Sequence, residues 1–171
     1  MSLLYSLDSG VLQLINQSFH TPLLNSLALL VSYMGVIYFG LAVVLLLYLS
    51  GDKKRKHVAL VLLVSLILTF IVVHTLKICV MRPRPYTVMD SLVVLAHEND
   101  YSFPSGHTAI ATCIAWVLAR NYGNYKYFML IPFMVALSRL YLGVHYPSDV
   151  ICGFICGMVI ALLVGYLDNN H

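Results

Sequence analysis

The sequence predicts an all-α fold: a multi-pass transmembrane helical bundle of five or six spans, with a short N-terminal interfacial helix. Of the 171 residues, 60% are hydrophobic and 10% are charged, whereas a soluble domain carries about 25% charged residues. Long apolar runs alternate with short polar segments, and a bilayer-spanning helix needs about 20 apolar residues. We therefore expect a single domain over residues 1–171, embedded in the cell membrane.

Composition also narrows the classes of function. The net charge is only +3, and the basic residues fall in short clusters that membrane topology explains, so nothing indicates nucleic-acid binding. The four cysteines lack the spacing of metal or redox sites. No carboxylate cluster suggests a divalent cation, so we expect no metal and no cofactor. The sequence leaves the oligomeric state open.

The N-terminal third contains an amphipathic segment and a long apolar one. Residues 1–21 carry apolar residues at helical spacing but are too polar to cross a bilayer. They predict a helix lying at the interface, with Asp8 or Ser9 as its cap. Residues 23–49 are nearly all apolar, with Gly35 in the middle. Either one tilted helix crosses here, or a half-helix turns near Gly35 before a second helix.

The remaining segments define a topology. Residues 51–56 form the densest basic run, which marks a cytoplasmic loop. The apolar segments 58–76, 107–119, 127–138 and 150–167 then lead out, in, out and back. This alternation places one group of polar residues at the extracytoplasmic boundary: Lys77, Arg84, Ser105, His107, Arg139, His145 and Asp149.

Such a gathering of charge at the hydrocarbon edge is costly and usually marks a functional site. Lys and Arg at helix ends also snorkel towards lipid phosphates. Snorkelling explains any one of these cations. It does not explain why three cations, two histidines and an aspartate converge, so we expect a functional site on the extracytoplasmic side.

The stretch Pro104-Ser105-Gly106-His107 is typical of an anion site at a helix start. Pro104 suits the first helical turn, and Gly106 lets the backbone approach a ligand closely. The Ser105 hydroxyl and the amides of residues 105–107 would be unpaired donors, at the end where the helix dipole favours negative charge.

Three cations can complete a phosphate cradle around that helix start. Lys77 and Arg84 are joined by a segment that prolines hold extended, which allows both side chains to reach one anion. Arg139 adds a planar fork that suits phosphate oxygens.

His145 and Asp149 supply the chemistry. Pro147 is expected to start the last helix, with Asp149 in its first turn and within reach of His145. A carboxylate on one ring nitrogen fixes the tautomer and leaves the other nitrogen as a nucleophile. His107 can then protonate the leaving oxygen. The alternative role for the His145–Asp149 pair is purely structural, as a helix cap.

Together these residues resemble the three-part signature of the type 2 phosphatidic acid phosphatase superfamily. The parts lie within residues 77–149: Lys77-x6-Arg84-Pro85, Pro104-Ser105-Gly106-His107 and Ser138-Arg139-x5-His145-x3-Asp149. The resemblance implies metal-independent dephosphorylation of a lipid phosphate or diphosphate through a phosphohistidine. By that match His145 is the nucleophile, Asp149 its orienting partner and His107 the general acid. The matching phosphate binders are Lys77, Arg84, Ser105, Gly106 and Arg139.

The resemblance also suggests a substrate class. This small chain is similar to the prokaryotic members that recycle polyprenyl diphosphate carriers, so we expect an undecaprenyl-type diphosphate. Phosphatidylglycerophosphate, phosphatidic acid and lipid A phosphates stay open. Soluble vanadium haloperoxidases share the signature, but the membrane composition argues against their reaction. A non-enzymatic anion or lipid transporter is the alternative of another class. Residues 98–100 (Glu-Asn-Asp) are interpreted as a solvated loop, with an influence on headgroup choice as the alternative.

Overall fold

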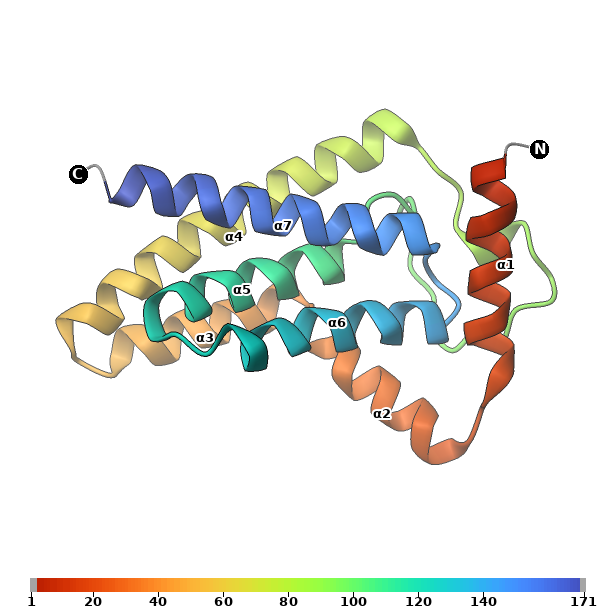
Figure 1. Cartoon of the computed structure of the whole chain (residues 1–171), viewed down its shortest axis with the longest axis horizontal. Coiled ribbons are helices and arrows are strands. Elements are labelled where there is room, and N and C mark those ends of the chain that lie inside the picture. The colour runs from red at the N-terminus through yellow and green to blue at the C-terminus, as the bar shows by residue number, and fades with distance from the viewer. Residues whose placement is uncertain (1–2, 170–171) are drawn as a thin grey trace.

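Most helices of the protein form a bundle along the long axis of the molecule, and one helix lies across an end of this bundle (Figure 1). The computed structural model describes residues 3–169. Among these residues the elements are α1 (Leu3–Ser18), α2 (Pro22–Tyr33), α3 (Ile37–Leu49), α4 (Lys53–Val80), a short 3-10 helix (Pro85–Thr87), α5 (Gly106–Tyr122), α6 (Tyr125–Tyr141) and α7 (Pro147–Asp168). The expected all-α, multi-pass architecture is confirmed.

Two of the described helices, α4 and α7, are each long and apolar enough to cross a membrane. The pair α2 and α3, bent by 58°, passes the same test when taken as one broken span. Helices α5 and α6 have 17 residues each, or about 26 Å at 1.5 Å per residue. By length and composition the described residues therefore hold two or three candidate spans, fewer than the five or six expected.

The long apolar segment 23–49 is broken near Gly35. This matches the expected alternative of a half-helix that turns before a second helix. Helix α2 ends at Tyr33 and α3 begins at Ile37, with Gly35 between them. A Cβ atom at Gly35 would clash with the backbone carbonyl of His107. The bend therefore lies directly against the first turn of α5, in a space that only a glycine fits.

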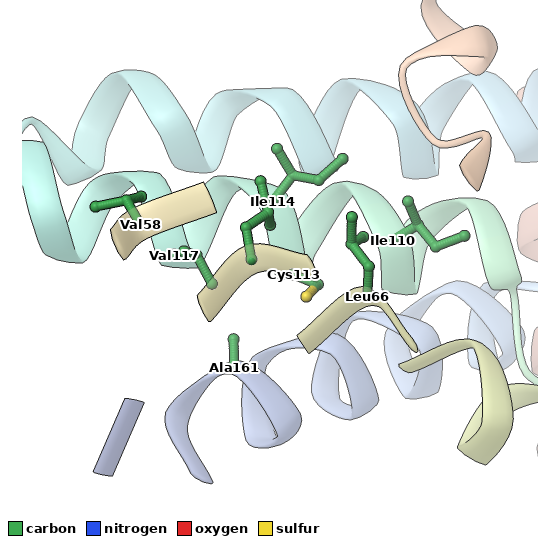
Figure 2. Close-up of a cluster of buried hydrophobic side chains, with 8 residues drawn as sticks. Val58, Leu66, Ile110, Cys113, Ile114, Val117 and Ala161 are labelled. Atoms are coloured by element: carbon green, nitrogen blue, oxygen red, sulfur yellow. The ribbon is translucent and has the colours of Figure 1, made fainter. Parts of the chain in front are cut away.

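Helix α5 is the centre of the bundle. Its apolar side chains pack between α4 and α7, while the opposite faces of α4 and α7 expose large apolar residues, as expected for helices in lipid. The core cluster comprises Val58, Leu62, Leu66, Ile110, Cys113, Ile114, Val117 and Ala161 (Figure 2).

Helices α5 and α7 approach one another unusually closely. A Cβ atom at Gly153 would meet the carbonyl oxygen of Ser105, and one at Gly157 would meet that of Ala109. Small residues allow such backbone contact between membrane helices. The contact sets the start of α5 against the first two turns of α7, where the Ser105 amide donates to the Asp149 carbonyl over 3.0 Å.

The N-terminal helix lies across the end of the bundle at which α5 and α7 begin (Figure 1). Leu12 is buried there, and the Asn16 amide donates to the carbonyls of Val93 and Tyr141. The expected helix is confirmed, but the expected capping role of Asp8 is wrong. The helix begins at Leu3, and the Asp8 carboxylate is buried in mid-helix because it binds partners on the bundle.

A leucine at Gly157 should separate α5 from α7. We expect Gly157→Leu to lower the free energy of unfolding by about 1–3 kcal/mol, the usual cost of overpacking. The control Gly10→Ala has no atom within 4 Å of the added methyl and should stabilise α1 by roughly 0.5–1 kcal/mol. Thermal unfolding in detergent measures both, and equal stability of Gly157→Leu and the wild type would contradict the close packing.

Candidate active site

All eight residues singled out from the sequence lie at one end of the bundle. Direct contacts link Arg84, His145, Asp149 and Ser105, and Glu98 and Asp100 connect Lys77, His107 and Arg139 to this group. The eight residues come from the end of α4, the start of α5 and the segment from the end of α6 to the start of α7, and the loop 81–105 packs among them. The eight are Lys77, Arg84, Ser105, Gly106, His107, Arg139, His145 and Asp149.

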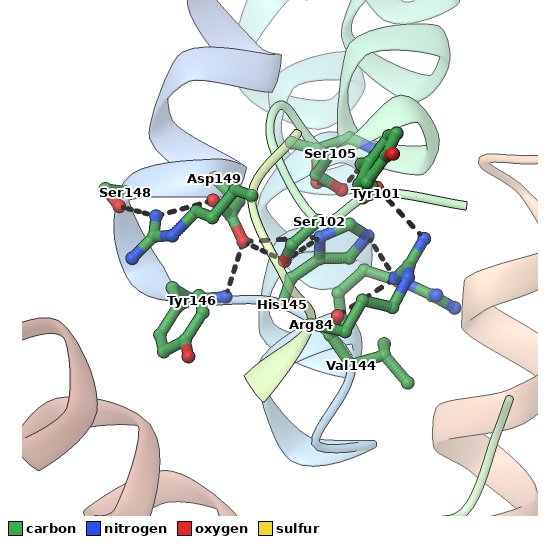
Figure 3. Close-up of polar contacts among 12 residues, drawn as sticks. Arg84, Tyr101, Ser102, Ser105, Val144, His145, Tyr146, Ser148 and Asp149 are labelled. Atoms are coloured by element: carbon green, nitrogen blue, oxygen red, sulfur yellow. Dashed lines mark hydrogen bonds and ion pairs between the residues drawn. The ribbon is translucent and has the colours of Figure 1, made fainter. Parts of the chain in front are cut away.

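His145 is fully buried beside Asp149 (Figure 3). Its Nδ1 lies 3.5 Å from Asp149 Oδ2, which is within ion-pair range but long for a hydrogen bond. Ser102 stands between them: its hydroxyl donates to Asp149 Oδ2 over 2.5 Å and lies 3.5 Å from His145 Nδ1. The expected proximity is confirmed, and Ser102 is an additional member of the group.

The other ring nitrogen of His145 faces the cations. Nε2 lies 3.3 Å from Arg84 Nη1, and because a guanidinium can only donate, Nε2 is the unprotonated nitrogen. Burial first, and then the charges of Arg84 and Arg139, hold the pKa of His145 well below its usual value. The imidazole is therefore neutral at pH 7, and the lone pair on Nε2 is directed at the cation cluster.

Asp149 has a structural role as well as a place beside His145. Its Oδ2 accepts from the Tyr146 amide over 2.8 Å, which closes a capping box at the start of α7. Its Oδ1 accepts from Arg82 over 2.7 Å. The position of Pro147 at the first turn is as expected. The capping role and the contact with His145 are thus both present in one carboxylate.

The three predicted phosphate-binding cations are buried together. Arg84 Nη1 donates to the Val144 carbonyl over 2.9 Å, and Arg139 Nη1 donates to the Ser32 hydroxyl over 2.6 Å. Arg139 Nε is buried without a hydrogen-bond partner. Lys77 is buried at the end of α4. Buried charges of one sign require counter-charges.

Glu98 and Asp100 supply those counter-charges. The expectation of a solvated loop is wrong for Glu98, which is partly buried, whereas Asn99 and Asp100 are exposed as expected. Glu98 accepts from Arg84 over 2.6 Å and also from Arg139. Asp100 accepts from Arg84 and lies 3.1 Å from Lys77. The sequence does not reveal these ion pairs, because the partners Arg84, Arg139 and Lys77 lie on other segments of the chain. The two carboxylates contact the same three cations that the sequence predicts as phosphate binders.

The charge of Glu98 is fixed by its partners. Burial raises the pKa of this carboxyl group, but Arg139 and Arg84 outweigh burial and lower the pKa to about 2. Glu98 therefore stays ionised at neutral pH and competes with any anion that approaches the cations. Glu98 Oε1 also lies 3.8 Å from His107 Nδ1, so the same carboxylate adjoins the second histidine.

The start of α5 differs in detail from the expected anion site. Ser105 is the N-cap, and its hydroxyl accepts from the Thr108 amide over 3.4 Å. The Ser105 amide donates to the backbone carbonyl of Asp149, so it is not an unpaired donor. Pro104 lies before the N-cap and not in the first helical turn. The amides of Gly106 and His107 stand in the first turn, where an α-helix leaves its N–H groups without intrahelical partners.

A cavity of about 220 Å³ opens beside His107. Lys77, Glu98 and Asp100 line its polar end. Its remaining walls come from the α2–α3 bend, α4 and α5, and include the apolar side chains of Val36, Ile37, Phe70, Val73 and Ile110. The cavity therefore joins a charged end to an apolar wall at the level of the helix ends.

Sequence reasoning missed three contributors: Ser102, the Glu98–Asp100 pair and Asp8. Asp8 carried a usable signal, since it is the only acidic residue before Asp52 and sits in a helix with an apolar face. Ser102 lies two residues before the Pro104 motif and carried no signal of its own. Its role depends on the fold of the loop.

Comparison with known proteins finds a matching family and similar proteins. The family model described as PAP2 superfamily matches residues 58–171. An undecaprenyl-diphosphatase of Sulfolobus acidocaldarius is 29% identical over 150 residues, which cover 86% of this chain and 72% of that protein.

Two solved structures have similar folds. A transmembrane PAP2-type phosphatidylglycerolphosphate phosphatase from Bacillus subtilis superposes with a TM-score of 0.82 at 26% identity, covering 99% of this chain and 88% of that one. LpxE of Aquifex aeolicus gives a TM-score of 0.81 at 29% identity, covering 92% of this chain and 94% of that one.

Removal of the Glu98 charge should favour anion binding. We expect Glu98→Gln to bind vanadate about tenfold more tightly than the wild type, because vanadate no longer has to displace a carboxylate from the cations. The hydrogen bonds of that carboxylate to charged groups are each worth roughly 1.5–3 kcal/mol. Asp90→Asn, which removes a charge from an exposed position of the same loop, is the matched control and should leave affinity unchanged. Titration calorimetry measures both, and weaker binding to Glu98→Gln would contradict competition.

Proposed function

The chain belongs to the PAP2 superfamily and is a membrane lipid phosphatase, and on that basis we propose that it hydrolyses a polyprenyl diphosphate through a phosphohistidine at His145. The observation that carries the proposal is the orientation of His145. Its Nε2 faces Arg84 at 3.3 Å, while its Nδ1 faces the Ser102–Asp149 pair. The family match favours an enzyme over the transporter alternative.

In the first step His145 Nε2 attacks the terminal phosphorus. A nitrogen–phosphorus bond forms as the bond from phosphorus to the bridging oxygen breaks, and the lipid monophosphate leaves. Lys77, Arg84 and Arg139 hold the non-bridging oxygens and stabilise the charge that develops on them. His107 donates a proton to the leaving oxygen. The Ser105 hydroxyl and the Gly106 amide complete the set of donors at the start of α5.

In the second step water attacks the phosphohistidine. His107, which has given up its proton, now accepts one from the water, and the phosphorus–nitrogen bond breaks to release inorganic phosphate. Asp149 stabilises the positive charge that His145 carries while it is phosphorylated. Both steps draw their positive charge from protein side chains, so no metal ion is required.

Substrate binding is an exchange of anions. In the free protein Glu98 and Asp100 neutralise Arg84, Arg139 and Lys77. A phosphoryl group that enters the cradle must displace these carboxylates, and it offers more charge and more acceptor oxygens than either of them. A diphosphate is favoured over a monophosphate on this ground, since it can replace two carboxylates at once.

The cavity beside His107 supports a lipid substrate. Its polar end meets Lys77 and its other walls are apolar, which suits a phosphate joined to a hydrocarbon chain. A volume of about 220 Å³ holds only the headgroup and the first part of a polyprenyl chain, so the tail extends into the bilayer. The undecaprenyl-diphosphatase relative supports the same class of substrate.

We propose five spans with the site on the extracytoplasmic side. The α2–α3 pair, α4, α5, α6 and α7 each cross once, with the 17-residue helices extended by their flanking turns. Residues 53 and 77 of α4 are separated by about 36 Å of helix at 1.5 Å per residue. The basic run 53–56 therefore lies at the far end from the cradle, and the positive-inside rule places it in the cytoplasm.

Loss of the nucleophile should abolish catalysis without disturbing the fold. We expect His145→Ala to lower phosphate release from a detergent-solubilised polyprenyl diphosphate by at least about 10⁴-fold, as for loss of other essential nucleophiles. His57→Ala, an exposed histidine at the opposite end of α4, is the control. Wild-type release should persist in EDTA, and near-normal turnover by His145→Ala would refute the assignment.

A substrate panel tests the proposed class. We expect undecaprenyl diphosphate to give the highest kcat/KM when compared with phosphatidylglycerophosphate, phosphatidic acid and a lipid A phosphate at equal mole fraction in detergent micelles. The physical reason is the second phosphate, which adds contacts to the cation cluster. A clear preference for any of the three monoesters would replace the proposed substrate while leaving the mechanism intact.

A further inference from the structure

We propose that Asp8 of α1 is a positioning residue for catalysis, acting through Arg82 on Asp149. The inference rests on the proposed role of His145 and extends it to a part of the chain outside the matched family segment, residues 58–171. Neither Asp8 nor Arg82 belongs to the signature that identified the site. The two residues form a continuous charged link from the N-terminal helix to the carboxylate beside the nucleophile.

The link has short, direct contacts. Arg82 Nη1 lies 2.7 Å from Asp149 Oδ1, and Arg82 Nη2 lies 2.8 Å from Asp8 Oδ2. One guanidinium thus joins two buried carboxylates. The Tyr146 ring covers it, with the ring centroid 3.9 Å from Arg82 Cζ. The guanidinium is held on three sides and so fixes the orientation of Asp149.

The charges explain why Arg82 needs a second carboxylate. Asp149 must offset the positive charge that grows on the His145 ring as it attacks phosphorus. Arg82 alone would neutralise Asp149 and cancel that effect. With Asp8 included, the group of three carries a net charge of −1, which balances one positive charge on the imidazole. Asp8 therefore lets Arg82 orient Asp149 without weakening its electrostatic contribution.

Asp8 also has a structural role, which a substitution must leave intact. Its Oδ1 accepts from the Ser148 amide over 2.9 Å, in the first turn of α7. This contact caps the helix and needs only an acceptor oxygen. An asparagine keeps that oxygen and the shape of the side chain while it removes the charge, so Asp8→Asn separates the two roles.

The test compares Asp8→Asn, Arg82→Gln and the double variant by steady-state kinetics on the lipid diphosphate. We expect Asp8→Asn to lower kcat about tenfold, with KM changed less than about twofold, because Asp8 does not contact the phosphate cradle. In the Arg82→Gln background the further change Asp8→Asn should have little effect, since the two residues act through one link.

Asn16→Ala is the matched control. Asn16 is equally buried on α1 and anchors the helix to Val93 and Tyr141, but it does not contact Arg82. Its substitution should lower thermal stability in detergent and leave kcat unchanged. A kcat loss in Asn16→Ala equal to that of Asp8→Asn would show that α1 acts only as a structural support, and would overturn the proposal.

Other outcomes also decide the question. Wild-type kcat in Asp8→Asn, or independent, multiplicative losses in the double variant, would overturn the link. If Asp8→Asn does not fold, Arg82→Gln tests the same link without altering α1, and wild-type kcat in that variant would overturn it. Failure of the proposed function is distinct: it would appear as full activity of His145→Ala, whatever the behaviour of Asp8.

Discussion

The close contact between α5 and α7 is the constraint on which the rest of the site depends. Gly153 and Gly157 leave no room between α7 and the carbonyls of α5, so the start of α5 is held against the first two turns of α7. That arrangement sets His107 on one N-terminus and His145 before the other. Two motifs separated by almost 40 residues of chain then face one group of cations. A bulkier residue at either glycine would move the histidines apart before it altered any catalytic group.

Charge balance is the second principle of the site. Three buried cations would be costly in the free protein, and the loop 81–105 meets that cost with Glu98 and Asp100. In the proposed function, the phosphoryl group replaces these carboxylates rather than water. Its affinity would then depend on the difference between two sets of ion pairs. The same logic explains Asp8, which offsets Arg82 on the other side of Asp149.

Much of this protein could be predicted from the sequence, because its strongest signals are local. Apolar length predicted most of the helices, and Pro147 predicted the start of α7. The three motifs named residues that the fold gathers at one end of the bundle. What could not be predicted depends on contacts between distant segments. The solvated-loop interpretation of Glu98 followed from its polar neighbours, and only the fold places it against Arg84 and Arg139. Likewise, the periodicity of α1 does not reveal that Asp8 meets Arg82.

The central claim is that His145 carries the phosphoryl group during turnover. Trapping of the phosphorylated protein tests this claim most directly. The protein is mixed with a lipid diphosphate labelled in its terminal phosphate, quenched in base and digested. The account predicts a label that is stable in base, labile in acid and located on the peptide that contains His145. Absence of a covalent label under turnover, or a label on the peptide that contains His107, would contradict the account.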